Sequence, residues 1–205
     1  MSIAHWKTFL TRFSLDLLER LEQDQYEQLH NDVKASKWMG FAGATMVEIR
    51  HAEACVGSRL PQSYREFLSV TNGWRRVDNF VDGLWPVNEV DWLRSKNQSI
   101  VDAWVGPVAG GEMPDIPDEE YLTYGPTQDP ARLRVEYLQS ALEIGWGQDS
   151  VFLLLNPEIV SERGEWEAWF LAHWLPGAQR FRSFEQMMHG LHDQFVDSFP
   201  KLRDA

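Results

Sequence analysis

The spacing of apolar residues changes along the chain, and this change constrains the fold more than any other feature. Up to about residue 35, large apolar side chains recur at intervals of three and four, the period of a helix with one buried face. These residues are Trp6, Phe9, Leu10, Phe13, Leu17, Leu18, Leu21, Tyr26, Leu29 and Val33. Residues 151–155 are instead apolar at every position, as in a strand that is covered on both faces. Helices first and strands late are typical of an α+β fold.

Most of the expected strands lie in the C-terminal third. Residues 142–146 and 151–155 flank a short stretch at 147–150 that is typical of a hairpin. The aromatic-rich segment 165–174 should pair with the second of these strands, and a short strand is expected within 80–87. We therefore predict an α+β fold with a central, mostly antiparallel sheet, helices packed around it, and an N-terminal helical extension.

Turn and capping residues place the remaining helices. One helix should begin at Met46 and stop at Gly57, and the next should follow Leu60 and Pro61 and end at 72–73. A further helix is expected to begin within 89–93, and another at 129–130 that runs through residue 138. Ser183 should cap the last helix, with Gln186 completing a capping box.

The charge of the chain is negative and unevenly distributed. Residues 78–120 contain ten acidic and two basic residues, so this segment carries −8 of the formal net charge of −12. A field of this sign repels nucleic acid and anionic membranes and speeds the encounter with basic partners. We expect a protein partner, with neither nucleic acid nor membrane involved. Acidity that serves only solubility remains an alternative.

The cysteine content and the first residues bear on localisation. Cys55 is the only cysteine, which excludes an intrachain disulfide. The first residues lack the continuous apolar run of a secretory signal, and no stretch approaches the length of a membrane-spanning helix. We therefore expect a cytoplasmic protein.

Few residue patterns point to catalysis or metal binding. His51 and Cys55 are four apart on an expected helix and could touch, but we expect Cys55 to be a small buried apolar group. His189 and His192, with Glu185 one turn earlier, could meet a metal from one face, yet we expect solvated surface histidines because further ligands are missing. We predict no catalytic, cofactor-binding or metal site.

Several short motifs resemble a known family. Glu53, Val56 with Gly57, LPQSYREFL at 60–68 and Asn72 with Gly73 are similar to the signature of the SUKH superfamily, the domains related to fungal cell-wall assembly regulators of the Smi/Knr type. Val56 stands where that signature has leucine. The segments LEIG at 142–145, VFLLLNP at 151–157, EWEAWF at 165–170 and a closing helix at 184–195 also fit. We assign 41–199 to this domain and 1–40 to the N-terminal helical extension.

The resemblance implies both a fold and a function. It implies helices on a mostly antiparallel sheet and no catalytic residue. Bacterial members are described as immunity proteins that neutralise toxins delivered between competing cells, many of them nucleases, and fungal members as regulatory scaffolds. The matching positions are expected to serve the fold: Leu60, Pro61, Tyr64, Phe67, Leu68, Asn72, Gly73 and Gly145.

Together these observations predict a non-catalytic protein-binding domain, an immunity protein that neutralises a basic bacterial toxin domain, with a nuclease as one candidate. The acidic rim of the interface should consist of Glu112, Asp115, Asp118, Glu119 and Glu120. Trp74 and Trp104, beside expected loops, are candidate aromatic anchors. Two alternatives remain open: a regulatory scaffold without a toxin partner, and an enzyme that uses His51 with Cys55 or the histidine pair. The oligomeric state is also open.

Overall fold

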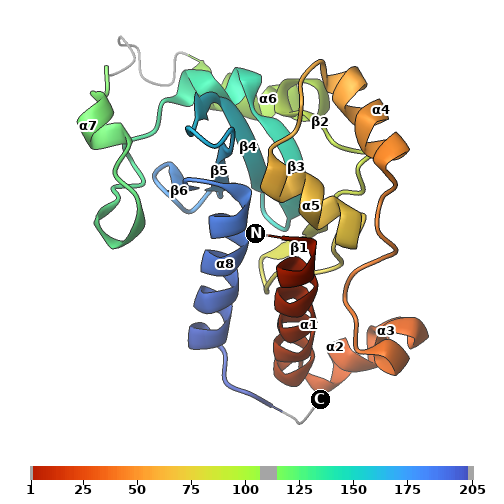
Figure 1. Cartoon of the computed structure of the whole chain (residues 1–205). Coiled ribbons are helices and arrows are strands. Elements are labelled where there is room, and N and C mark those ends of the chain that lie inside the picture. The colour runs from red at the N-terminus through yellow and green to blue at the C-terminus, as the bar shows by residue number, and fades with distance from the viewer. Residues whose placement is uncertain (1, 107–114, 203–205) are drawn as a thin grey trace.

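The computed structural model describes residues 2–106 and 115–202, and its longer helices and strands follow the predicted order (Figure 1). The helices of the first half are α1 (Ile3–Arg20), α2 (Gln23–Gln28), α3 (Asn31–Ser36), α4 (Met46–Val56), α5 (Gln62–Val70) and α6 (Leu93–Val105). Those of the second half are α7 (Asp118–Tyr121), the 3-10 helices η2 (Gly125–Thr127) and η3 (Val135–Ser140), and α8 (Phe184–Ser198). The strands are β1 (Val81–Leu84), β2 (Asp91–Trp92), β3 (Leu142–Gly147), β4 (Val151–Val160), β5 (Trp166–Leu171) and β6 (Ala178–Phe181). No helix in the described residues is both long and apolar enough to cross a membrane.

The strands form one antiparallel sheet in the order β1-β3-β4-β5-β6, and the short β2 also pairs with β3. The predicted hairpin is confirmed, since β3 and β4 are joined at the pair Gly147 and Val151. β4 is the central strand, and its residues 151–156 are all buried, as the unbroken apolar run predicts. β5 pairs with β4, also as predicted. The α+β fold class is therefore confirmed.

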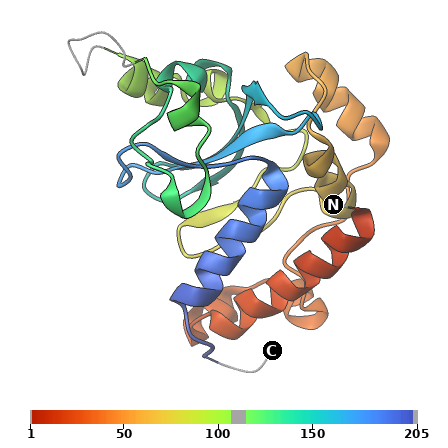
Figure 2. The same cartoon turned by 60° about the vertical axis from the view of Figure 1, so that its left-hand side comes forward.

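The two faces of the sheet are covered by different helices. Along β4, Leu153 and Leu155 belong to one apolar cluster, whereas Phe152 and Leu154 belong to another, because successive side chains of a strand point to opposite faces. The first cluster takes in buried residues of α1, α4, α5 and α8, and the second takes in those of α6, α7 and η3. The sheet is thus the middle layer of the domain (Figures 1 and 2).

The N-terminal helix packs onto the first layer rather than standing apart. α1 lies alongside α8 in both views (Figures 1 and 2), and Trp6 of α1 packs against Phe67 of α5 and Phe184 of α8. Its predicted apolar stripe is buried, apart from a partly buried Phe9. After α3, the chain adds two single-residue antiparallel bridges to the sheet, Gly40 to Trp74 and Trp74 to Leu84.

One predicted helix differs from the structure. The prediction of a helix that begins at 129–130 is wrong, since the segment turns and then forms only η3. The reason is that the Pro130 carbonyl oxygen accepts a hydrogen bond from Ala178 N at 3.2 Å, so this segment covers the edge strand β6. α6 begins at Leu93, at the end of the range expected for its start, because the two residues before it pair with β3. The cap of α8 is as predicted at Ser183, but Gln186 accepts a hydrogen bond from Arg182 N instead of closing the box on Ser183.

The signature positions lie in the core and at turns. Leu60, Tyr64, Phe67 and Leu68 are buried on α5 or just before it, and Pro61 is the N-cap of that helix. The turn after α5 is held by Asn72, whose Oδ1 accepts a hydrogen bond from Val87 N at 2.7 Å, and Gly73 has a φ of 98°. A Cβ on Gly145 would lie 2.7 Å from the Gly83 carbonyl oxygen, so the pairing of β1 with β3 requires glycine there.

Candidate functional site

The predicted acidic rim is centred on α7, on the layer that covers the second face of the sheet. Asp115, Asp118, Glu119 and Glu120 are all exposed, whereas Glu112 lies outside the described residues. Two of the four have a basic neighbour, since Asp118 pairs with Arg134 at 2.6 Å and Glu120 with Arg132 at 3.5 Å. Asp115 and Glu119 form no ion pair with any residue that the structure describes. Of the visible rim, these two carry the charge that is least balanced within the chain.

The two candidate anchors are less exposed than an anchor on a free surface should be. Trp74 has 0% exposure and packs edge-on against Trp38 at 5.3 Å between ring centroids, so it cannot enter a partner in this conformation. The reason is its backbone position, because Trp74 bridges Gly40 and Leu84 as an extra sheet residue. Trp104 is half-buried against the second apolar cluster.

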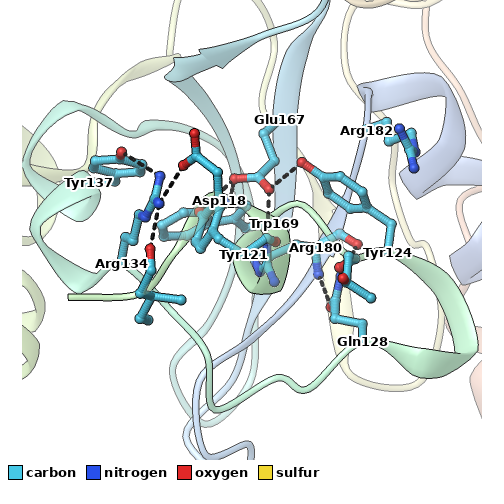
Figure 3. A network of polar contacts seen from close by, with 12 residues as sticks. Asp118, Tyr121, Tyr124, Gln128, Arg134, Tyr137, Glu167, Trp169, Arg180 and Arg182 are labelled. Atoms are coloured by element: carbon cyan, nitrogen blue, oxygen red, sulfur yellow. Dashed lines mark hydrogen bonds and ion pairs between the residues drawn. The ribbon is translucent and has the colours of Figure 1, made fainter. Parts of the chain in front are cut away.

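Beneath α7, a fully buried carboxylate organises a polar network. Glu167 of β5 accepts hydrogen bonds from the hydroxyls of Tyr121 and Tyr124, both at 2.8 Å, and from the indole N–H of Trp169 at 2.6 Å (Figure 3). It also pairs with Arg180 of β6 at 3.2 Å, and neither charged side chain has any exposed surface. Figure 3 shows Glu167 between the two tyrosines, with Arg180 on one side and the pair of Asp118 and Arg134 on the other. The acidic helix is thereby fastened to the sheet.

Burial and the neighbouring carboxylate keep the two tyrosines in their neutral form. Burial raises the pKa of Tyr121 and Tyr124, and the negative charge of Glu167 raises both further. Neutral phenols can donate hydrogen bonds to Glu167 over the whole physiological pH range. The network around Glu167 therefore keeps both phenol hydrogen bonds throughout this pH range and has a structural role.

Arg180 extends the network around Glu167 to the segment that follows α7. Its guanidinium carbon lies 4.0 Å from the centroid of the Tyr121 ring, and Nη1 donates to the Tyr121 carbonyl oxygen. The Gln128 side chain accepts from Arg180 N at 2.7 Å and donates to Arg180 O at 2.9 Å, as a neighbouring strand would. Residues 118–128 are thus held at both ends by β5 and β6.

Other buried polar residues on the same face of the sheet hold the rest of this layer. Glu143 of β3 accepts hydrogen bonds from Asn97 Nδ2 at 2.6 Å and Trp85 Nε1 at 2.9 Å, and pairs with Lys96 at 3.2 Å. Asn97 has non-helical φ and ψ values within α6, so the helix is kinked where it meets this carboxylate. Asn156 of β4 donates to the Tyr137 carbonyl oxygen at 3.4 Å. Sequence reasoning missed this face, although charged residues inside apolar strands were a visible signal.

The candidate metal and thiol residues lie elsewhere. His192 is buried, contrary to the expected surface position, because its Nε2 lies 3.0 Å from Asp16 Oδ2 on α1. Cys55 is exposed, which contradicts the expected burial: the inner face of α4 is formed by Ile49, Ala52 and Val56. Its Sγ lies 3.7 Å from His51 Nε2. Among residues 2–106 and 115–202, no three His, Cys, Asp or Glu side chains are grouped so that they could hold a metal ion.

Comparison with known proteins identifies the family of this fold. The sequence model of the SMI1 / KNR4 family (SUKH-1) matches residues 43–189, from just before α4 into α8. A search of curated proteins found no match. The matched stretch is well over half of the 205 residues and leaves α1, α2 and α3 outside it. The chain therefore belongs to the SMI1 / KNR4 family (SUKH-1).

Proposed function

We propose that this protein is a non-catalytic binding domain that acts as an immunity protein, which neutralises a bacterial toxin by forming a tight complex with it. Domains of this family generally bind partner proteins, which supports a binding role. The observation that carries the proposal is the exposed acidic helix α7, which a buried network holds on the sheet. A rigidly placed acidic surface fits a basic partner, such as a toxin domain that must itself hold phosphate groups.

The expected contribution of each part follows from its position. Asp115 and Glu119, which form no ion pair with a described residue, attract the basic partner and chiefly raise the association rate. Asp118 and Glu120 already have the arginine neighbours Arg134 and Arg132, so their charges contribute less. Because the contacts of Glu167 and Arg180 order residues 118–128 before binding, little conformational entropy is lost when the complex forms.

The test is co-expression with the product of the adjacent gene in cells that this product poisons. The immunity proposal predicts restored growth and a complex that survives purification. In binding kinetics, the double variant Asp115→Asn/Glu119→Gln should associate more slowly and with a weaker dependence on salt. A matched control, Asp24→Asn/Asp197→Asn, removes two charges from α2 and α8 and should leave the rate near that of the parent.

The outcomes separate the parts of the proposal. If the poisoned cells do not recover and no complex forms, the immunity role is refuted. If a complex forms without recovery of growth, the regulatory-scaffold alternative is favoured instead. If the acidic variant keeps the rate and salt dependence of the parent, α7 is not the recognition surface.

A further inference from the structure

A hollow of about 510 Å³ lies where the N-terminal extension meets the first strands of the sheet. One wall is formed by residues from α2 to the loop after α3, including Leu29 and Phe41. The opposite wall is formed by residues of β1, β3 and their neighbours, including Trp85 and Trp146. The hollow is therefore built in part by residues that precede the family match, which begins at residue 43.

The aromatic wall already binds a cation on one side. Trp85 and Trp146 are stacked, with ring centroids 3.7 Å apart and planes inclined by 19°. Lys96 Nζ lies 3.8 Å from the centroid of the Trp85 ring. Indole rings attract cations most strongly among the aromatic side chains. Both indoles also line the hollow. Because Lys96 and Trp146 cover the two faces of the Trp85 ring, a cation entering the hollow would stack on Trp146.

The charged residues of the hollow leave two carboxylates without close partners. Arg75 pairs with Asp32 at 3.0 Å and lies over the Phe41 ring at 3.9 Å. Arg76 donates to the Asp78 carbonyl oxygen and to Asn79 Oδ1, both at 2.8 Å. Two other carboxylates line the hollow, those of Asp82 and Glu89.

The carboxylates of Asp82 and Glu89 form no hydrogen bond or ion pair with any residue described by the structure. Arg76 attracts Asp82 only at longer range. The hollow thus combines stacked indoles with unmatched negative charge.

We infer that this hollow is a docking site for an arginine side chain of the protein partner, an inference that rests on the proposed binding of a basic partner. A guanidinium group can stack on an indole and donate to carboxylates at its edge, whereas an ammonium group is more strongly hydrated and cannot stack.

The experiment uses the full chain, labelled with ¹⁵N at its ten tryptophans, and three small probes. N-acetyl-arginine methylamide is the test compound, the lysine analogue is the second, and the citrulline analogue is an uncharged isostere of arginine. The arginine probe should cause saturable shifts of the indole N–H signals of Trp85 and Trp146, assigned with Trp85→Phe and Trp146→Phe. The citrulline probe should bind about fivefold or more weakly, because it lacks the cation that the indoles and carboxylates attract. The lysine probe should bind with intermediate strength.

Variants locate the site on both walls. Asp82→Asn/Glu89→Gln should reduce the affinity for the arginine probe to that for citrulline. Phe41→Ala should weaken the binding of this probe because it opens the wall formed by residues from 28 to 41. Asp24→Asn/Asp197→Asn is the control and should bind like the parent. Equal binding of arginine and citrulline, shifts confined to other tryptophans, or no shift up to the solubility limit of the probe would each overturn the inference.

The assay contains no toxin, so its failure is distinguishable from failure of the proposed function. If the arginine probe does not bind but co-expression restores growth, the immunity role is supported and this docking site is refuted. If the probe binds at the two tryptophans but no protein partner is neutralised, the hollow recognises arginine and the immunity role is refuted.

Discussion

Replacement of Glu167 by glutamine tests how much the buried hydrogen-bond network around Glu167 contributes to the stability of the fold. The substitution keeps the size of the side chain and one acceptor oxygen but removes the charge that faces Arg180. Arg180 cannot turn to solvent, since its side chain has 0% exposure. Its Nη1 faces Glu167, and its Nε and Nη2 have no hydrogen-bond partner among the described residues. The variant therefore leaves a cation buried without a counter-charge.

The expected loss of stability follows from that geometry. Removal of one partner of a buried ion pair costs about 3–5 kcal/mol, since the remaining charge stays desolvated. For a chain of this size, 1 kcal/mol corresponds to about 2–4 °C in Tm, so Glu167→Gln should lower Tm by roughly 6–20 °C. Removal of the stranded cation in Glu167→Gln/Arg180→Met should restore at least about 1 kcal/mol relative to the single variant.

Urea unfolding followed by circular dichroism measures these differences directly. Glu158→Gln on β4 is the matched control, because Glu158 is exposed and the change should stay within about 0.5 kcal/mol. A loss below about 1 kcal/mol for Glu167→Gln would show that the pair is not buried as described. A double variant less stable than the single one would show that Arg180 is stabilised by other groups.

Three further predictions concern other parts of the molecule. Burial raises the pKa of Asp16, but the hydrogen bond and charge of His192 and the charge of Arg20 lower this pKa more, so it lies below 3.8. The stability that this carboxylate contributes is present above its unfolded pKa and is lost as the pH falls through its folded pKa. Urea unfolding should therefore find Asp16→Asn less stable than the parent at pH 7, with the gap closing at pH values below the folded pKa, and an unchanged gap would contradict this. Glu165 accepts a hydrogen bond from Ser63 N at 2.9 Å at the start of α5, so Glu165→Ala should cost about 1–2 kcal/mol in the same assay, and a neutral result would show that this cap is dispensable. Cys55 is exposed, so one thiol should react with a maleimide in the folded protein, as counted by mass spectrometry; a thiol that reacts only after unfolding would place Cys55 inside.

Local chemistry made several elements predictable. Gly57 ends α4 with a φ of 72°, and Ser183 starts α8 by accepting a hydrogen bond from Gln186 N, because such positions depend on a few neighbouring residues. The central strand was predictable from 151–155 because only burial on both faces suits an unbroken apolar run. The helix expected from 129–130 failed for the opposite reason: a contact with Ala178, far along the chain, decides the conformation of Pro130.

The candidate site was predictable only in part. The acidic surplus of 78–120 is a property of composition, and Asp118, Glu119 and Glu120 are indeed exposed. Their balance with Arg132 and Arg134 required the fold, since those partners lie more than ten residues away. The burial of Trp74 was also hidden, because a tryptophan beside a turn has the same local sequence whether it faces a partner or the sheet.

The sequence by itself determined the order of the longer helices and strands, the central place of β4 and the family, because these depend on hydrophobic period and on short motifs. Tertiary structure alone decided which charged residues are buried. Glu143, Glu167 and Arg180 share one face of the sheet because strand register places them there. Residues of α6 or of 118–128 form hydrogen bonds with each of the three side chains. Burial of a carboxylate inside a strand is unfavourable unless it is hydrogen-bonded, and the local sequence does not show its partners. Segments distant in the sequence supply these partners and make the burial possible.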